Sequence, residues 1–179
     1  RSPIIQNYLY KNHFLRIQKY ERISFHSLPV PSIEIEAVEI KFDKISSRLF
    51  VDKLILYPKL VSIYNYDNFK IKKVILKEGK TELKILESDI FFEKILNQKK
   101  PFSIKKINLK LTNKNDFLIN LNNINYANFG YDKNVLYGKL INKNFEVKLN
   151  DDFSKIDIKI PDISFKKNLK LEKNNGDAT

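Results

Sequence analysis

The chain has 179 residues, of which 42% are apolar and 30% are charged, and its formal net charge is +12. That length fits one domain, or one long sheet, with enough apolar surface to bury a core. The sequence has no cysteine, which excludes disulfides, thiolate catalysis and cysteine-ligated metal sites. It begins with Arg1 and lacks an initiator methionine, so we expect a fragment of a larger chain.

The first 26 residues are expected to be helical or extended. Residues 3–11 predict a short helix, because Pro3 is tolerated in a first turn and Ile5, Tyr8 and Leu9 then share one face.

Residues 13–25 allow two interpretations. Their apolar residues fit a helical period, but 22–25 also fits the start of a strand. The following stretch, 27–32, contains Pro29 and Pro31, which forbid a helix and predict an extended turn.

Residues 33–42 form the clearest predicted strand. The apolar residues alternate at spacing two, but the phase changes near Ala37, which predicts a β-bulge there. One phase holds Ile33 and Ile35, and the other holds Val38, Ile40 and Phe42.

One short phrase occurs three times in the chain. It reads large apolar, any residue, branched apolar, polar, Lys, apolar, any residue, Leu, and it covers 49–56, 69–76 and 102–109. The copies are followed by short alternating runs at 60–64, 81–85 and 117–121. A recurring phrase predicts a repeated two-strand unit, although any meander in an Ile/Lys-rich chain resembles itself. The phase changes inside the copies, as it does near Ala37, which predicts a strongly curved sheet.

A helix is predicted at 88–99. Ser88 would be its N-cap, and Lys99 and Lys100 would close it before Pro101. Because exposed strand edges need protection, we expect this helix to cover an edge or an open end of the sheet.

The last third of the chain reads as a meander of short strands. These strands are expected at 117–121, 124–126, 135–141, 145–149, 156–160, 163–165 and 169–171. No long crossover separates them, which predicts an antiparallel sheet. The predicted fold is mainly β, with one or two short helices. Its sheet is a curved, bulged antiparallel meander that is able to curl into an open groove. We expect a segment at 1–26, a β domain at 27–172 and a disordered tail at 173–179.

Two stretches resemble the N-terminal region of the AsmA-like family of bacterial envelope proteins. They are the proline turn and strand at 27–40 and the phrase at 51–63, and the resemblance covers about residues 4–121. It implies a periplasmic protein that is anchored to the inner membrane by a helix ahead of this region. It also implies a long curled sheet with an apolar concave side that takes part in phospholipid transport and outer-membrane assembly.

A strand surface larger than the helices can cover must curl on itself or hold a ligand. An acyl chain gains about 0.8 kcal/mol per CH₂ buried in such a groove. The residues that we expect on the concave face are Ile33, Ile35, Ile40, Phe42, Val74, Leu76, Ile107, Leu109, Phe117 and Ile119. Each could equally be an ordinary core residue.

No catalytic, cofactor or metal site is predicted. His13 and His26 lack the spacing of a helical metal pair and are expected on the surface or in turns. Asp151 and Asp152 are expected in a turn, and no Gly-rich phosphate loop is present.

Three functions therefore remain open. The first is non-catalytic handling of phospholipid, whose partners would be acyl chains, the inner membrane and the rest of the chain. The second is a structural or interaction module of the cell envelope with a self-filled core. The third is a basic nucleic-acid-binding β domain, which is disfavoured because lysine is interleaved with acidic residues along every strand.

Overall fold

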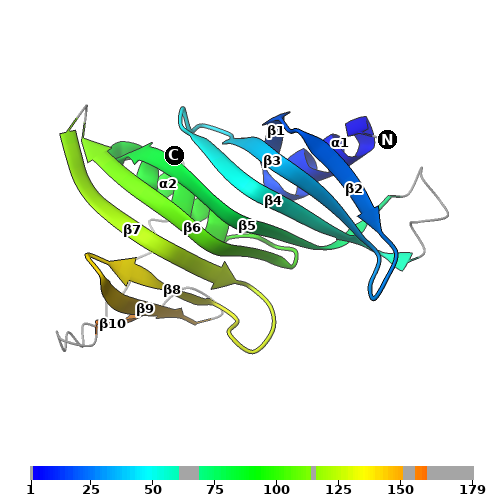
Figure 1. Cartoon of the computed structure of the whole chain (residues 1–179). Coiled ribbons are helices and arrows are strands. Elements are labelled where there is room, and N and C mark those ends of the chain that lie inside the picture. The colour runs from blue at the N-terminus through cyan, green and yellow to red at the C-terminus, as the bar shows by residue number, and fades with distance from the viewer. Residues whose placement is uncertain (1, 61–68, 114–115, 151–155, 161–179) are drawn as a thin grey trace, which may run out of the picture.

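One curled sheet of ten strands, with two helices on one of its faces, makes up the fold in the computed structural model (Figure 1). The structure describes residues 2–60, 69–113, 116–150 and 156–160. The helices are α1 (Ser2–His13) and α2 (Ile85–Leu96). The strands are β1 (Leu15–Lys19), β2 (Arg22–His26), β3 (Ser32–Phe42), β4 (Arg48–Pro58), β5 (Ile71–Lys84), β6 (Phe102–Asn113), β7 (Asp116–Ala127), β8 (Val135–Leu140), β9 (Lys143–Leu149) and β10 (Ile156–Lys159).

The sheet is open and mostly antiparallel, with the order β1-β3-β4-β5-β6-β7-β8-β9-β10. β2 also pairs with β3, so β1 and β2 share one edge: β1 lies along the second half of β3 and β2 along the first half. The helical interpretation of 13–25 is therefore wrong. Helix α1 ends where Phe14 takes a positive φ of 58°, and the chain then runs extended along the sheet edge.

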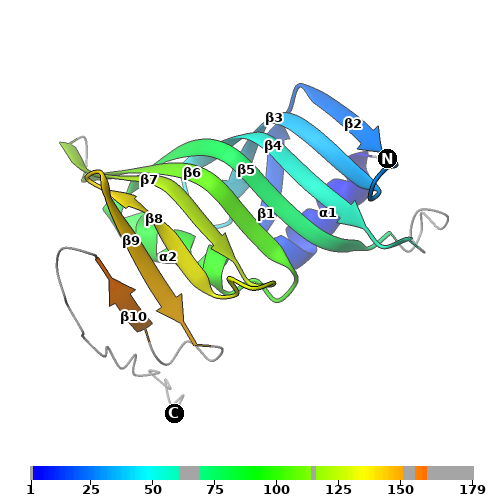
Figure 2. The ribbon, with the colours of Figure 1, turned by 60° about the horizontal axis from the view of Figure 1, so that its bottom comes forward.

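The expectation of a wholly antiparallel sheet is wrong at one place. β5 and β6 are parallel. Helix α2 connects them and returns the chain to the end of the sheet at which β5 begins, so it acts as a crossover connection. The helix lies over β5 and β6 and covers a face of the sheet, whereas the sequence led us to expect that it covers an edge (Figure 2).

Helix α2 also begins earlier than predicted. Its N-cap is Lys84, and Ser88 lies inside the first turns, where its hydroxyl donates to the Ile85 carbonyl oxygen (2.6 Å). The first turn is tied down by Glu87, whose carboxylate accepts hydrogen bonds from Ser46 and Ser47 in the turn between β3 and β4.

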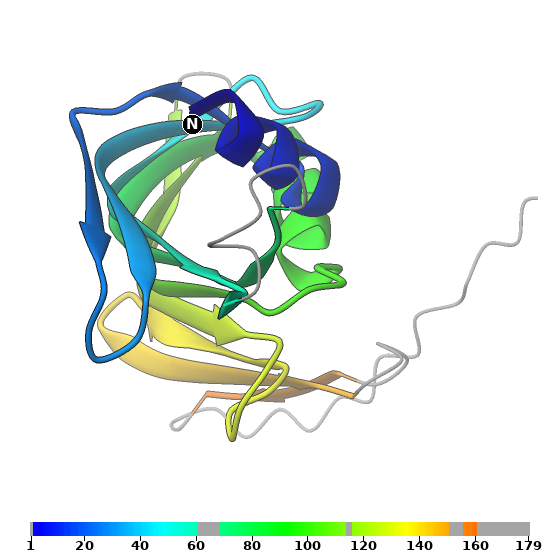
Figure 3. The ribbon, with the colours of Figure 1, turned by 90° about the vertical axis from the view of Figure 1, so that its right-hand side faces the viewer.

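Positive φ angles recur at one level across the sheet. They occur at Ala37 (50°), Glu78 (53°), Lys106 (55°) and Asn123 (52°), on β3, β5, β6 and β7. The pattern of buried side chains changes phase in each strand near this level. The change of phase predicted near Ala37 is therefore confirmed, and the row of positive φ angles gives the strong curvature a local cause. The predicted bulge is wrong in one respect: β3 keeps its register with β4 from Glu36–Lys53 to Val38–Val51, so the two strands bend together without an extra residue. Figure 3 shows the result: the sheet forms a C, and α1 and α2 lie across its open side.

The three copies of the repeated phrase lie in β4, in β5 with the residues just before it, and in β6. Buried residues change phase from Ile71 to Val74 in the second copy and from Ile104 to Ile107 in the third, as the sequence predicts. The first copy shows a similar change from Val51 to Leu54. The run at 81–85 is no separate strand but the continuation of β5. The run at 60–64 lies almost wholly outside the described residues, as do the strands expected at 163–165 and 169–171 and the tail.

The core lies between the two helices and the face of the sheet that they cover, which we call the inner face. Leu9 of α1 and Ile95 of α2 are both fully buried, as are Leu54 and Leu76 of the central strands. A hydrogen bond from the Tyr8 hydroxyl to the Ile71 carbonyl oxygen (3.0 Å) fixes α1 to the start of β5.

His13 lies in this core, with only 1% of its surface exposed, so its expected place on the surface is wrong. Its Nδ1 lies 2.7 Å from Oε1 of Gln98, and Gln98 Nε2 donates to the carbonyl oxygens of His13 and Lys94. Burial lowers the pKa of His13, the Gln98 hydrogen bond raises it in part, and the charge of Lys100 lowers it further. The native state therefore holds His13 neutral.

We expect the protein to lose stability as the pH falls below about 6.5, the ordinary pKa of histidine, because the pKa of His13 is lowered in the folded state. The unfolded state binds a proton there and the native state does not, so the free energy of unfolding falls by up to about 1.4 kcal/mol per pH unit until the folded pKa is reached. Urea unfolding at several pH values measures this slope. His13→Asn should remove it and His26→Asn, at an exposed position, should keep it. An unchanged slope in His13→Asn would contradict the assignment.

Candidate functional site

The ten residues expected on the concave face are split by the structure. Seven are buried core residues with at most 1% of their surface exposed: Ile35, Ile40, Phe42, Val74, Leu76, Ile107 and Leu109. Ile33 and Ile119 are half-buried, whereas Phe117 is 57% exposed, next to a shift in pairing between β6 and β7. Side chains of the helices and of the sheet thus already occupy the N-terminal part of the inner face.

The inner face is different at its C-terminal end, over β7 to β10. A hollow of about 160 Å³ lies there, which we call the C-terminal trough. It is lined by Phe92, Leu121, Ile124, Leu136, Leu140, Phe145, Ile158 and Ile160. All eight side chains are apolar, and Phe92 of α2 borders the trough from the helix side.

Strand alternation explains why these residues gather in one place. Leu136 of β8 pairs with Val147 of β9, and Gly138 pairs with Phe145, so that alternate residues of both strands point to the inner face. A Cβ atom at Gly138 would lie 2.9 Å from the Asn122 carbonyl oxygen and 3.2 Å from Cε1 of Phe145. Glycine at this position therefore allows the Phe145 ring to lie close against the strand backbone.

The helix side of the trough is held by Tyr126. Its ring is buried, and its hydroxyl donates to the Leu96 carbonyl oxygen at the end of α2 (3.1 Å). Burial raises the pKa of Tyr126 to about 12, so this hydroxyl stays protonated and remains a donor. The tyrosine thus ties the end of α2 to β7, beside Ile124 of the trough.

The described residues give the trough apolar walls and no charged lining side chain, which suits a hydrocarbon chain. The trough is smaller than the roughly 300–1,000 Å³ of most ligand pockets, so it would take up a segment of an acyl chain and leave the rest outside. Sequence reasoning missed this site, because residues 135–160 show only the pattern of a strand meander. The sequence does not show which part of the sheet the helices leave uncovered.

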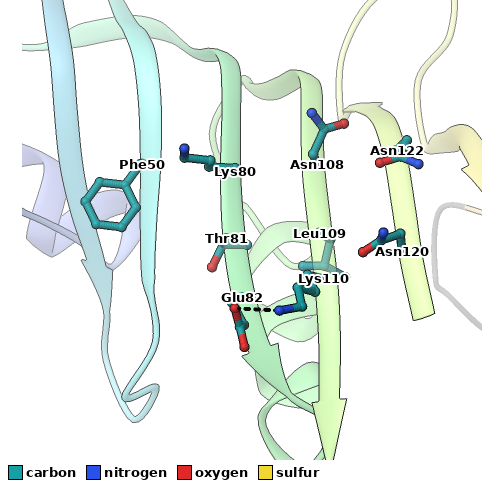
Figure 4. Close-up of a pocket in the computed structure, with 9 residues that line it drawn as sticks. All are labelled: Phe50, Lys80, Thr81, Glu82, Asn108, Leu109, Lys110, Asn120 and Asn122. Atoms are coloured by element: carbon teal, nitrogen blue, oxygen red, sulfur yellow. Dashed lines mark hydrogen bonds and ion pairs between the residues drawn. The ribbon is translucent and has the colours of Figure 1, made fainter. Parts of the chain in front are cut away.

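A second hollow, of about 330 Å³, lies on the outer face across β4 to β7 (Figure 4). It is lined by Phe50, Lys80, Thr81, Glu82, Asn108, Leu109, Lys110, Asn120 and Asn122, most of which are polar or charged residues. Its carboxylate is already paired, since Glu82 Oε2 lies 3.2 Å from Lys110 Nζ. This surface has the character of a solvated strand face, as the interleaved charges of the sequence predict.

Within the described ranges, no group of three His, Cys, Asp or Glu side chains is placed to hold a metal ion. His26 lies exposed at the end of β2, and Asp151 and Asp152 fall outside the described residues. No helix in the described part of the chain has the length and apolar character to cross a membrane.

Comparisons of the chain with protein-family models, with curated proteins and with solved structures give no match. The resemblance to the AsmA-like family therefore stays a prediction from the sequence.

Proposed function

We propose that this chain is a non-catalytic, lipid-handling segment of a bacterial envelope protein that binds acyl chains in the C-terminal trough. The observation that carries the proposal is the all-apolar lining of a hollow on the inner face of an open, curled sheet. In this proposal the chain lies in the periplasm, as part of a protein anchored to the inner membrane. That placement comes from the resemblance to the AsmA-like family alone.

Hydrocarbon burial would supply the binding energy. Each CH₂ group removed from water contributes about 0.8 kcal/mol, and the contacts are non-directional. A bound chain could therefore slide along the trough without breaking specific hydrogen bonds. The trough lies at the edge of the sheet, beside β10, the last strand described.

A second function is favoured by the packing of the inner face. Seven of the ten residues expected to line a groove are core residues beneath α1 and α2. A structural or interaction module of the envelope, with a core filled by its own side chains, would bury these seven residues in the same way. The trough is what separates the two proposals.

Replacing Ile158 with aspartate should separate them. Ile158 lines the trough and is 38% exposed, so a carboxylate there spoils the apolar lining at little cost to folding. We expect the affinity for a fluorescent fatty acid to fall at least about tenfold, because a charge next to the chain must be desolvated. Ile141→Asp is the matched control, since Ile141 is 75% exposed in the turn between β8 and β9.

Lipid extraction and mass spectrometry of the purified protein complete the test. Lipid that co-purifies with the native sequence and with Ile141→Asp, but not with Ile158→Asp, supports acyl-chain binding. A folded protein that carries no lipid and does not bind the fatty acid would overturn this proposal in favour of the self-filled module.

A further inference from the structure

A third hollow lies at one end of the strands and is not part of the trough. Its volume is about 1410 Å³, and it extends from the turn between β2 and β3, over the end of β4, to Phe129. This end of the sheet lies at the right of Figure 1. We call it the proline-turn end, because Pro29 and Pro31 shape its outermost turn.

Large aliphatic side chains project into solvent at this end. Leu28 is 83% exposed and Val30 is 55% exposed, both in the proline turn, and Leu60 beyond β4 is 65% exposed. The core does not use these side chains. Their projection from turn tips requires an explanation, since grouped exposed apolar residues mark contact sites.

Lysines surround these aliphatic side chains. Lys59, Lys72 and Lys73 line the hollow, and Nζ of Lys73 lies 4.1 Å from the ring centroid of Tyr57 and 5.5 Å from that of Phe129. Burial lowers the pKa of Lys73, and the charges of Lys105 and Lys72 lower it further. An anion placed here would relieve this crowding of positive charge.

The acidic residue of the hollow does not cancel that charge. Glu34 Oε1 lies 2.6 Å from Nζ of Lys53, so its carboxylate already has a cation as partner. The other titratable groups of the lining are the imidazole of His26 and the phenol of Tyr57, and neither adds a negative charge at neutral pH. The described residues of the proline-turn end therefore present a net positive surface with aliphatic tips.

From this arrangement we infer that the proline-turn end docks on the surface of an anionic phospholipid bilayer. Leu28, Val30 and Leu60 enter the interface between headgroups and acyl chains, and the lysines contact the lipid phosphates. Lysine stems are apolar and follow the aliphatic side chains into the interface while each ammonium stays at the phosphate level. The inference stands apart from the trough and uses none of its residues.

A fluid anionic surface fits these features better than an acidic protein does. The cores of protein interfaces are depleted in lysine and enriched in aromatic residues that fill fixed pockets. Here separate aliphatic tips stand among lysines, and a bilayer adapts to such tips without a complementary shape.

Vesicle co-sedimentation of the full chain tests the inference. The vesicles are phosphatidylcholine alone, or phosphatidylcholine and phosphatidylglycerol in a two-to-one ratio. We expect binding to the anionic vesicles only, and weaker binding at high salt. Replacing Leu28 and Val30 together with aspartate should lower the partition coefficient at least about tenfold. Lys72→Gln with Lys73→Gln should lower it by about fivefold per lysine.

Matched pairs elsewhere on the surface provide the controls. Leu86 and Ile141 are 87% and 75% exposed, so Leu86→Asp with Ile141→Asp repeats the change of charge away from the proline-turn end. Lys80→Gln with Lys84→Gln, both at exposed positions of β5, repeats the loss of two lysines. Binding should survive in both control variants.

Three results would overturn the inference. They are equal binding to neutral and anionic vesicles, equal losses in the control variants, and binding that does not change when Leu28 and Val30 are replaced. The last result would mean that general attraction by a basic chain suffices. Fatty-acid binding by the trough should be unaffected by Leu28→Asp with Val30→Asp, so the two proposals can fail separately.

Discussion

Replacing Gly79 with alanine is expected to lower the free energy of unfolding by about 3 kcal/mol. Gly79 lies in β5, one residue after Glu78 with its positive φ of 53°, and pairs with Val51 on one side and Ile107 on the other. A Cβ atom there would collide with the carbonyl oxygen of Phe50 and would lie 2.9 Å from Cγ1 of Val51. The first of these neighbours is backbone and cannot move without disturbing the ladder between β4 and β5.

Urea unfolding measures this loss, and Gly130→Ala is the control. Gly130 has a φ of +84°, and no atom lies within 4 Å of the position that an added methyl group would take, so alanine there should cost only the conformational penalty of about 1 kcal/mol. If Gly79→Ala lowered the free energy of unfolding no more than Gly130→Ala does, the strands next to Gly79 would be able to move apart to accept a methyl group. The curved part of the sheet would then be more deformable than the row of positive φ angles implies.

The phase changes in the strands could be predicted from the sequence, and there is a physical reason. Side chains in a strand alternate with a period of two, so a phase change such as that from Ile104 to Ile107 can be recognised in the sequence alone. The consequence, a curved sheet, follows from local geometry and needs no knowledge of distant contacts. The fold class was therefore accessible from sequence.

The direction of β6 was not accessible in the same way. Whether a helix such as α2 caps an edge or crosses a face depends on where its apolar side packs, and Phe91 and Ile95 would satisfy either arrangement. The parallel pairing of β5 and β6 follows only once that choice is made.

The same limit applies to the candidate site. The apolar alternation at Phe145 and Val147 predicts a strand, but the absence of a helix above a given strand is a tertiary property. The burial of His13 could not be predicted for the same reason. Its partner Gln98 is 85 positions away, and no residue near His13 in the sequence indicates this contact.

The second large effect is expected for Leu9→Asp, which should lower the free energy of unfolding by about 4 kcal/mol. Leu9 is fully buried where α1 covers the inner face, and it belongs to the same apolar cluster as the central strands. A carboxylate there would have to be desolvated among side chains such as Leu15 that offer it no hydrogen bond. Ile4→Asp is the matched control, because Ile4 lies on the same helix and is 42% exposed.

The way in which Leu9→Asp unfolds bears on the function as well as on stability. If α1 is an integral part of one core, urea should unfold the helix and the sheet of this variant together, in a single transition with a lower midpoint. If α1 detached first and the sheet stayed folded, the result would contradict that expectation. The buried residues Val74 and Leu76 would then become accessible, and the inner face could form a longer groove than the trough alone. Binding of a fluorescent fatty acid to this variant distinguishes the two cases, because only a detached helix would leave a folded sheet with an increased capacity for acyl chains.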